Sequence, residues 1–301
     1  MSKPRSNPTL TIVILSFNVE RLLIDCLKSV FATQTTANSW KVVVADNVSS
    51  DNSVASVKKL FPQVEIIQNS QNLGFSKGNN VALRRVNTEY TLLLNPDTVV
   101  YPHTIQKVLA FMVDHLKVGA ATCRVELPDG SLDYSCHRGF PDPWNTFLYF
   151  FAGKLKKFSG YSDNPIPDIP HEIDALTGAF AMIRTKVGKK LNWLDEDYTW
   201  NGEDFDFCYR LKQLGWKVMY IPDVKITHFK GSSSGLWKTG QYQVAKAKKL
   251  TAARQGVDAM RIFYNKHLKV KYPWIFNQFI YLGMFLLKTI RQAKIHLGQG
   301  I

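Results

Sequence analysis

The sequence predicts an α/β protein in which a doubly wound, mostly parallel sheet carries helices on both of its faces. Two observations predict this fold. Continuous apolar runs, such as LTIVIL at residues 10–15 and KVVVA at residues 41–45, are typical of strands that are buried on both faces. Segments with apolar residues at helical spacing separate these runs, and strands that alternate with helices form parallel βαβ units.

The remaining elements follow from the same patterns. Further strands are expected at residues 64–67, 91–95, 118–127, 172–184 and 216–221, and helices at residues 19–31, 52–60, 102–115, 201–214 and 236–267. A loop rich in glycine and asparagine at residues 72–80 leads into a helix that ends near residue 86. Residues 141–170 mix aromatic residues, prolines and lysines, and we expect them to form an irregular insertion or lid.

The composition limits the possible classes of protein. The chain has 301 residues, 45% of them apolar, which suffices for a sizeable core, and its net charge is +14. Such a charge favours polyanionic partners: nucleic acid, an anionic membrane surface or a phosphorylated substrate. The four cysteines form no C-x-x-C pair, which argues against a zinc site or a disulfide framework and fits a reducing compartment. The apolar run at residues 10–15 is too short for a signal peptide, so we expect the catalytic part to stay in the cytoplasm.

Most of the positive charge lies near the carboxyl terminus. Between residues 238 and 294 lysines and arginines recur, whereas Asp258 is the one acidic residue. The apolar tail at residues 274–290 is interrupted by Asn277, Gln278 and Lys288, so it lacks the run of about 20 apolar residues that a spanning helix needs. We therefore expect basic, amphipathic helices that lie on a membrane surface. The alternative is a helix that packs on the domain, or on a second subunit in a homodimer.

One candidate site residue, Asp97, comes directly after a predicted strand. Because Pro96 cannot donate a hydrogen bond to a sheet, the strand should end at Asn95, with Asp97 just beyond its carboxyl end. Ligands of open α/β sheets bind at this edge. Asp97 is therefore either a turn residue that satisfies its own backbone or a ligand for a metal ion that carries a phosphate.

Other polar residues are expected at the same edge. Asp46 follows the second strand, and with Asp51 and the loop 72–80 it would line a site where short side chains and glycines let a nucleotide approach the backbone. Ordinary strand-to-helix loops use the same residue types, which is the alternative interpretation. The spacing of Gly74 and Gly78 matches neither a P-loop nor a dinucleotide fingerprint, which argues against a Walker-type ATPase or an NAD enzyme.

The helix expected at residues 201–214 begins with several acids. Asn201 is suited to cap this helix, and acids in a first turn are favoured by the helix dipole. Asp204 lies one turn before the residues of the apolar stripe, so it should point inwards, with Glu203 and Asp206 on its flanks. A carboxylate over a ligand cleft deprotonates hydroxyl groups, so Asp204 is a candidate general base.

His228 follows the last strand of the predicted sheet, at residues 216–221. A lone histidine in such a place is usually a structural residue. Next to Asp97, its imidazole would instead complete a site for a divalent ion such as magnesium or manganese. The glycine and serines at residues 231–234 would then hold phosphate oxygens.

In their order along the chain, these residues resemble family 2 glycosyltransferases with the GT-A fold. The resemblance covers roughly residues 9–235. It rests on the motifs SFN at residues 16–18, VADNxSxD at 44–51, NLGFSKGNN at 72–80, LNPD at 94–97, EDxDxCxR at 203–210 and HxxG at 228–231. Each motif alone is weak, whereas the ordered set is specific. The branch it resembles most is the bacterial rhamnosyltransferase-like enzymes of cell-surface polysaccharide assembly.

The resemblance implies an organisation and an activity. Residues 1–235 would form a GT-A catalytic domain, with a nucleotide-sugar half at 9–100 and an acceptor half at 101–235, and residues 236–301 would extend it. The implied reaction is an inverting transfer of a sugar from a dTDP- or UDP-sugar, with dTDP-rhamnose as the expected donor. The acceptor would be a glycan or a prenyl-diphosphate-linked hydroxyl, and the enzyme would be peripheral on the inner face of the cell membrane.

The resemblance also implies residue roles. Asp204 would be the catalytic base, and Asp97 and His228 would bind Mg²⁺ or Mn²⁺ on the diphosphate. Donor contacts would come from Ser16, Asn18, Asp46, Asn72, Gly74, Lys77, Asn80 and Asn95, and the acceptor side would include Gly178, Trp200 and Glu203. Asn95 departs from the family pattern, because it replaces the first acid of the D-x-D motif by an amide and so lowers the local negative charge.

Two other classes of protein are the alternatives. A sugar nucleotidyltransferase also uses an α/β sheet and a metal ion, but it would carry a glycine- and arginine-rich loop after the first strand, where this chain has SFN at residues 16–18. A nucleic-acid-binding protein is indicated by the net charge alone. Because the charge clusters beside an apolar tail rather than on the sheet, the sequence favours a membrane surface over nucleic acid.

Overall fold

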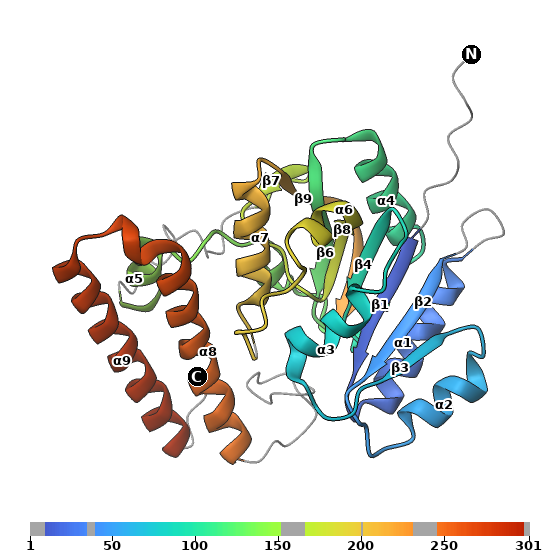
Figure 1. Ribbon diagram of the computed structural model, residues 1–301, viewed down its shortest axis with the longest axis horizontal. Coiled ribbons are helices and arrows are strands. Elements are labelled where there is room, and N and C mark those ends of the chain that lie inside the picture. The colour runs from blue at the N-terminus through green and yellow to red at the C-terminus, as the bar shows by residue number, and fades with distance from the viewer. Residues whose placement is uncertain (1–9, 35–39, 152–165, 200, 231–245, 298–301) are drawn as a thin grey trace.

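A central sheet with helices on both faces organises the chain (Figure 1). The computed structural model describes residues 10–34, 40–151, 166–199, 201–230 and 246–297. In this part of the chain nine strands form one sheet: eight follow the order β3-β2-β1-β4-β8-β6-β9-β5, and β7 pairs with β9 off this path. The strands are β1 (Leu10–Ser16), β2 (Lys41–Asp46), β3 (Glu65–Gln68), β4 (Tyr90–Leu94), β5 (Thr98–Val100), β6 (Val118–Glu126), β7 (His171–Ile173), β8 (Phe180–Arg184) and β9 (Lys217–His228).

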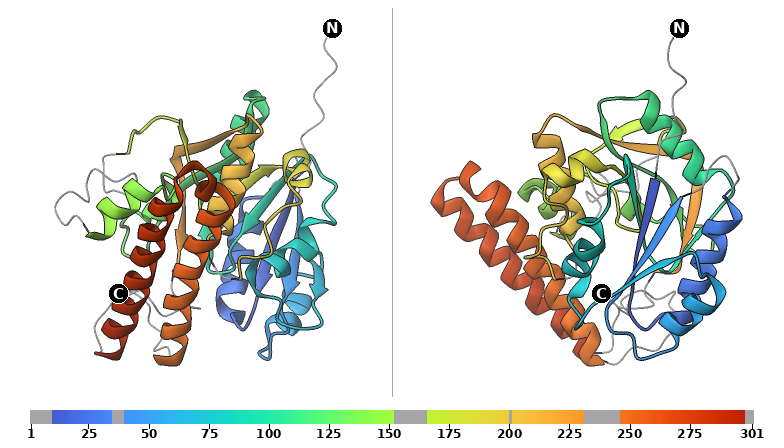
Figure 2. Two further views of the ribbon diagram at one scale, coloured as in Figure 1. Left: turned by 60° about the vertical axis from the view of Figure 1, so that its left-hand side comes forward. Right: turned by 45° about the vertical axis from the view of Figure 1, so that its right-hand side comes forward.

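The helices alternate with these strands. They are α1 (Glu20–Ala32), α2 (Ser53–Leu60), α3 (Gly74–Leu83), α4 (Thr104–Asp114), α5 (Pro143–Phe151), α6 (Thr185–Lys190), α7 (Glu203–Gln213), α8 (Lys246–Phe263) and α9 (Trp274–His296), with the short turns η1 (Tyr134–Cys136), η3 (Tyr264–Leu268) and η4 (Lys269–Lys271). Helices α1, α2 and α4 cover one face of the sheet, and α3 and α7 lie on the other face (Figure 2). The predicted α/β architecture is therefore confirmed.

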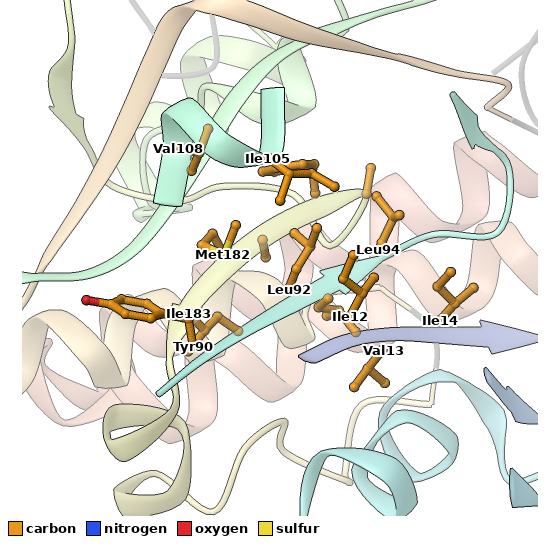
Figure 3. Close-up of a cluster of buried hydrophobic side chains, with 14 of the residues drawn as sticks. Ile12, Val13, Ile14, Tyr90, Leu92, Leu94, Ile105, Val108, Met182 and Ile183 are labelled. Carbon is orange, nitrogen blue, oxygen red and sulfur yellow. The ribbon is translucent and has the colours of Figure 1, made fainter. Parts of the chain in front are cut away.

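The amino-terminal half of the sheet is parallel. β3, β2, β1 and β4 all pair in parallel, and every residue of β1 and β4 is buried, as their continuous apolar runs predict. Side chains of β1, β4 and β8 meet those of α4 in one core, as Figure 3 shows for Ile12, Ile14, Leu92, Leu94, Met182, Ile105 and Val108. Each fully buried aliphatic side chain contributes about 1.5–3 kcal/mol relative to an exposed one. This core fixes the strand ends that carry the candidate site.

Beyond β4 the sheet is mixed. β8 runs antiparallel to both β4 and β6, and β6 and β9 pair in parallel. The single strand expected at residues 172–184 is in fact two strands, because β7 pairs with β9 whereas β8 pairs with β4 and β6. Since Phe180 lies opposite Leu94, the connection at residues 174–179 lies at the carboxyl edge of the parallel half.

Helices α8 and α9 pack on the sheet domain through a second apolar cluster. Tyr198, Ala259, Phe263, Tyr264 and Leu268 are its buried members. The boundary expected at residue 235, and the start of a helix expected at residue 236, lie outside the described residues. Within the described residues, no helix has both the length and the apolar composition that crossing a bilayer requires.

Two further expectations need correction. The motif at residues 72–80 is not a loop, because α3 already begins at Gly74. The segment at residues 141–170 is not irregular throughout, because α5 covers Pro143–Phe151 and β7 begins at His171; its residues 152–165 lie outside the described part of the chain.

Candidate active site

The site lies where the strands of one direction end. β1 ends at Ser16, β2 at Asp46, β4 at Leu94 and β9 at His228. β6 and β9 run in the direction of β4, because both neighbours of β8 are antiparallel to it and β9 is parallel to β6. Polar residues that follow these strands therefore gather at one edge of the sheet, which is where open α/β sheets bind ligands.

Asp97 and His228 face each other at this edge. β5 pairs with the end of β9 so that Thr98 lies opposite His228, which brings Asp97 Oδ1 to 3.3 Å from His228 Nε2. The Asn95 amide nitrogen lies 3.5 Å from the same ring nitrogen. Asp97 is 8% exposed and His228 6% exposed. The structure thus brings together the two residues that were expected to bind a metal ion.

Asp133, which the sequence analysis did not single out, lies on the other side of the His228 ring. Its Oδ2 is 3.4 Å from His228 Nδ1, and its Oδ1 accepts a hydrogen bond of 2.8 Å from Lys230 Nζ. Burial alone would raise the pKa of Asp133, but His228 and Lys230 hold it well below its ordinary value. Burial would lower the pKa of His228, but Asp97 and Asp133 raise it to about 9. The two carboxylates therefore make this place favourable for positive charge.

The donor set fits a small divalent cation. A carboxylate oxygen and an imidazole nitrogen are suitable ligands once the cation displaces the proton of His228, and Mg²⁺ in particular keeps positions for water and substrate phosphate. The second nitrogen of a metal-binding histidine usually donates to a carboxylate, which is the position of Asp133. In the described part of the chain no group of three or more His, Cys, Asp or Glu side chains is arranged to hold an ion. Asp97 and His228 are the protein ligands that this edge would offer to an ion.

The residues after β1 and β2 form a compact double turn. Asp46 is 1% exposed, and its carboxylate accepts hydrogen bonds from the backbone nitrogen and hydroxyl of Ser49, at 2.9 and 2.5 Å. Asn18, with a φ of 53°, accepts from Ser50 N at 2.7 Å and donates its own N–H to Ser49. The Ser16 hydroxyl is buried and makes no hydrogen bond within the described residues. Ser16, Asn18 and Asp46, three of the residues expected to contact the sugar donor, therefore lie together. The Asp46 carboxylate also accepts hydrogen bonds within its own turn.

Gly74 starts α3 in a conformation that only glycine adopts easily. Its φ is +75°, Asn72 Oδ1 accepts its N–H at 3.0 Å, and a Cβ at this position would lie 3.1 Å from the carbonyl oxygen of Thr199. Lys77 is exposed on the same helix. Asn72 and Lys77 are thus exposed near the amino end of α3, where a nucleotide sugar could contact them.

The Asn80 side chain is buried and occupied by protein partners, which corrects its expected role as a contact to the nucleotide sugar. It is 0% exposed, its Oδ1 accepts from Leu194 N at 3.1 Å, and its Nδ2 donates to Leu194 O at 2.8 Å and to Glu196 at 3.0 Å. The amide is therefore committed to the segment that precedes α7. The motif looked like a loop because asparagine and glycine are turn residues, but here Asn80 holds a neighbouring segment and Asn79 bonds Phe75 of its own helix.

The acids of α7 are oriented differently from the expectation. Glu203 is 6% and Asp206 0% exposed, whereas the Asp204 side chain keeps 14% exposure. Asp206 is buried because α8 and η3 cover this side of α7, and His267 Nε2 lies 2.7 Å from Asp206 Oδ1 while Arg210 Nε donates to Oδ2 at 2.6 Å. Asn201 is not the cap, since the residue before the helix is Gly202, with a φ of 92°.

Arg138 is a site residue that the sequence analysis missed. Its guanidinium donates to Asp204 Oδ2 at 2.5 Å and to the Leu176 carbonyl, and lies 4.0 Å from the centre of the Phe205 ring. Both side chains of the ion pair are largely buried, 16% and 14% exposed. No spacing in the sequence connects positions 138 and 204, so only the fold brings them together.

The connection at residues 174–179 places Asp204 and Asp97 at the same edge. Its Leu176 carbonyl accepts from Arg138, and its Ala179 carbonyl accepts from Asn95 N at 3.2 Å. The backbone from Leu176 to Ala179 spans at most about 11 Å, so the Arg138–Asp204 pair lies near the end of β4. Gly178 lies within this connection, where a Cβ would meet Phe75 of α3 at 3.4 Å, and its acceptor-side role stays a prediction. Trp200 lies outside the described residues.

Glu203 is a buried carboxyl beside Asp204. Its Oε2 makes no hydrogen bond within the described residues. Burial, together with the charge of Asp204, raises the pKa of Glu203 to about 8. The surroundings of Glu203 thus favour the neutral form of its carboxyl, and Arg138 contacts Asp204 rather than Glu203.

Comparison with known proteins identifies the family. The family described as "Glycosyltransferase like family 2" matches residues 7–244. The N-acetylglucosaminyl-diphospho-decaprenol L-rhamnosyltransferase of Mycobacterium tuberculosis is 23% identical over 209 residues, 64% of this chain and 68% of the relative. Rhamnosyltransferase WbbL of Escherichia coli K12 is 25% identical over 230 residues, 72% of this chain and 82% of the relative.

A solved structure shows the same fold. The mannosyltransferase PcManGT of Pyrobaculum calidifontis, in complex with GDP-Man and Mn²⁺, matches 97% of this chain and 74% of its own, with a TM-score of 0.58 and 15% identity. The fold is thus that of GT-A glycosyltransferases, and the sequence match extends over most of the chain. This protein belongs to glycosyltransferase family 2.

Proposed function

We propose that this protein is a metal-dependent, inverting glycosyltransferase that moves rhamnose from dTDP-rhamnose to a hydroxyl of a prenyl-diphosphate-linked glycan. Two similar proteins are named rhamnosyltransferases, and the name of one specifies an acceptor on diphospho-decaprenol. Such an acceptor stays in a bilayer, so the proposal includes a peripheral position at the cytoplasmic face of the cell membrane.

The observation that carries the proposal is the pair of Asp97 and His228. Their facing atoms lie 3.3 Å apart at the strand ends, and Asp133 orients the ring from behind. A bound divalent cation would supply positive charge to the departing nucleotide diphosphate. Asp97 and His228 would hold that ion, and the turn formed by Asn18 and Asp46 would contact the nucleotide.

Asp204 is proposed as the base that accepts the proton of the acceptor hydroxyl. The hydroxyl oxygen would then attack the anomeric carbon from the side opposite the diphosphate, which inverts the configuration. Arg138 holds Asp204 Oδ2, but a carboxylate offers about four lone-pair directions, so the acceptor hydroxyl still finds a place. Arg138 therefore acts as a positioning residue, and Glu203 and Gly178 would contribute to the acceptor side; Trp200, which was expected there too, lies outside the described residues.

Donor hydrolysis and transfer test the proposal. A panel of nucleotide sugars is incubated with the protein and Mn²⁺ or Mg²⁺, and dTDP-rhamnose is expected to turn over fastest, with loss of turnover after chelation. Asp204→Asn is expected to reduce transfer at least a hundredfold, while calorimetric affinity for the donor persists. Asp223→Asn is the matched control, since Asp223 forms an exposed ion pair with Lys107 on the surface. Normal turnover by Asp204→Asn would show that the base is another residue.

A further inference from the structure

Helix α9 is apolar on the side that faces away from the protein. The residues on this side are Ile275, Phe279, Leu282, Leu286 and Ile290, with exposures of 62%, 67%, 53%, 45% and 46%. Their spacing of three and four residues places them along one stripe of the helix. We call this stripe the outer face of α9. Trp274 extends it at the start of the helix and is 75% exposed.

The opposite side of α9 already has its partner. Asn277, Leu287 and Ile295 are buried, and Ile280, Tyr281 and Met284 pack against the cluster around Phe263. α8 lies between α9 and the sheet domain, so α9 is the outermost element on this side (Figure 1). A surface helix with apolar residues on both sides is unusual, because one apolar stripe suffices to pack it on a domain. The outer face therefore needs an explanation beyond folding.

The charge around the outer face indicates the partner. Along α9 the charged residues are Lys288, Arg291 and Lys294, and no acid occurs in this helix. In α8 the one acid is Asp258, whose carboxylate pairs with Lys288 at 3.2 Å. Lys288 and Arg291 lie on the side of α9 that meets α8, whereas Lys294 is exposed beside the outer face. An apolar stripe on a helix that carries basic residues and no acid complements a bilayer of anionic lipids, in which apolar side chains enter the acyl region and cations meet phosphates. A second copy of the chain would bring two strongly basic surfaces together, which is electrostatically unfavourable.

We propose that the outer face of α9 docks on an anionic phospholipid bilayer and lies parallel to its surface. Docking does not depend on the identity of the sugar or on the catalytic roles given above. It also explains why the helix pair is joined to the catalytic domain. His267, between α8 and α9, contacts Asp206 of α7, so a bilayer under α9 holds the acceptor side of the catalytic edge at a fixed distance from the membrane.

Vesicle binding of the full chain tests the proposal. Wild-type protein is sedimented with vesicles of phosphatidylcholine containing 30% phosphatidylglycerol and with vesicles of phosphatidylcholine alone. We expect binding to the anionic vesicles that weakens as salt is added. The double variant Phe279→Ser/Leu282→Ser is expected to bind at least tenfold more weakly, because burial of two large apolar side chains contributes more than 1.4 kcal/mol.

Two more variants separate docking from folding. Lys294→Glu leaves the outer face intact and reverses one exposed charge, and it is expected to weaken binding to anionic vesicles only. Leu116→Ser is the matched control, because Leu116 is 72% exposed but lies between α4 and β6, away from the helix pair. Hydrolysis of soluble donor should be unchanged in all three variants.

Several results would overturn the proposal. These are an absence of wild-type binding to anionic vesicles, or equal binding by the double variant. A third is a wild-type dimer in sedimentation velocity that the double variant converts to a monomer, which would assign the outer face to a second copy. Loss of donor hydrolysis with vesicle binding retained would instead count against the proposed activity and leave docking intact.

Discussion

The hydrogen bond between Asp206 of α7 and His267 of the helix pair can be tested by changing Asp206 to alanine. The carboxylate of Asp206 is fully buried and has two partners, Arg210 Nε at 2.6 Å and His267 Nε2 at 2.7 Å. The substitution removes both hydrogen bonds and leaves the guanidinium and the imidazole without their anion. We therefore expect the helix pair to be held less tightly and the folded state to be less stable.

The size of the effect follows from these contacts. A hydrogen bond to a charged group contributes about 1.5–3 kcal/mol. Arg210 keeps its bonds to the carbonyls of Leu191 and Trp193, and its side chain is 23% exposed, so water compensates part of the loss. We expect a decrease of about 3 kcal/mol in the free energy of unfolding. For a chain of this size that corresponds to a decrease in Tm of about 6 °C.

Calorimetric unfolding measures this change. Asp258→Ala is the control, because Asp258 pairs with Lys288 at the surface and is 39% exposed, so its loss should change Tm by about 1–2 °C. His267→Gln should retain much of the stability, since the glutamine amide still offers a donor to Asp206, whereas His267→Leu should not. A Tm of Asp206→Ala within about 2 °C of wild type would refute the reasoning.

Three other substitutions address the catalytic edge. Arg138→Gln should lower kcat about tenfold or more without changing donor affinity, because Asp204 loses its orientation; a change in KM for the donor alone would contradict this. Glu203→Gln should gain stability relative to wild type, by up to about 5 kcal/mol at about 1.36 kcal/mol per pKa unit, as pH rises from about 4.5 to 8, because over that interval the unfolded wild-type chain ionises this carboxyl while the folded state keeps it neutral; pH-independent differences in urea unfolding would exclude this. Asp133→Asn should weaken binding of Mn²⁺ in the presence of dTDP about tenfold, because His228 loses the carboxylate behind its ring; unchanged calorimetric affinity would count against that role.

The parallel half of the sheet was predictable from sequence for a physical reason. Strands buried on both faces must be apolar throughout, so β1, β2 and β4 leave continuous runs that no other element explains as well. Asp97 was predictable in the same way, because Pro96 ends the strand immediately before it. These inferences use neighbouring residues only.

Contacts between distant segments left no such signal. Strands β7 and β8 look like one apolar segment, and only their different partners in the sheet separate them. Arg138 reaches Asp204 because β6, β8 and α7 bring them together, and neither residue stands in a pattern with the other. The same holds for Asp206, which is buried by a helix pair that begins far along the chain.

The segment at residues 194–199 is shared by two parts of the molecule, α3 and the carboxyl-terminal helices. On one side α3 holds it, through Asn80 on Leu194 and through Ser76, whose hydroxyl donates to Tyr198 O at 2.9 Å. On the other side Lys266 pairs with Asp195 at 2.5 Å.

Tyr198 itself belongs to the apolar cluster of the carboxyl-terminal helices. A nucleotide sugar that displaces α3 and a lipid surface that displaces the carboxyl-terminal helices would thus act on the same short piece of backbone. Binding at one of these places would therefore affect the other through residues 194–199.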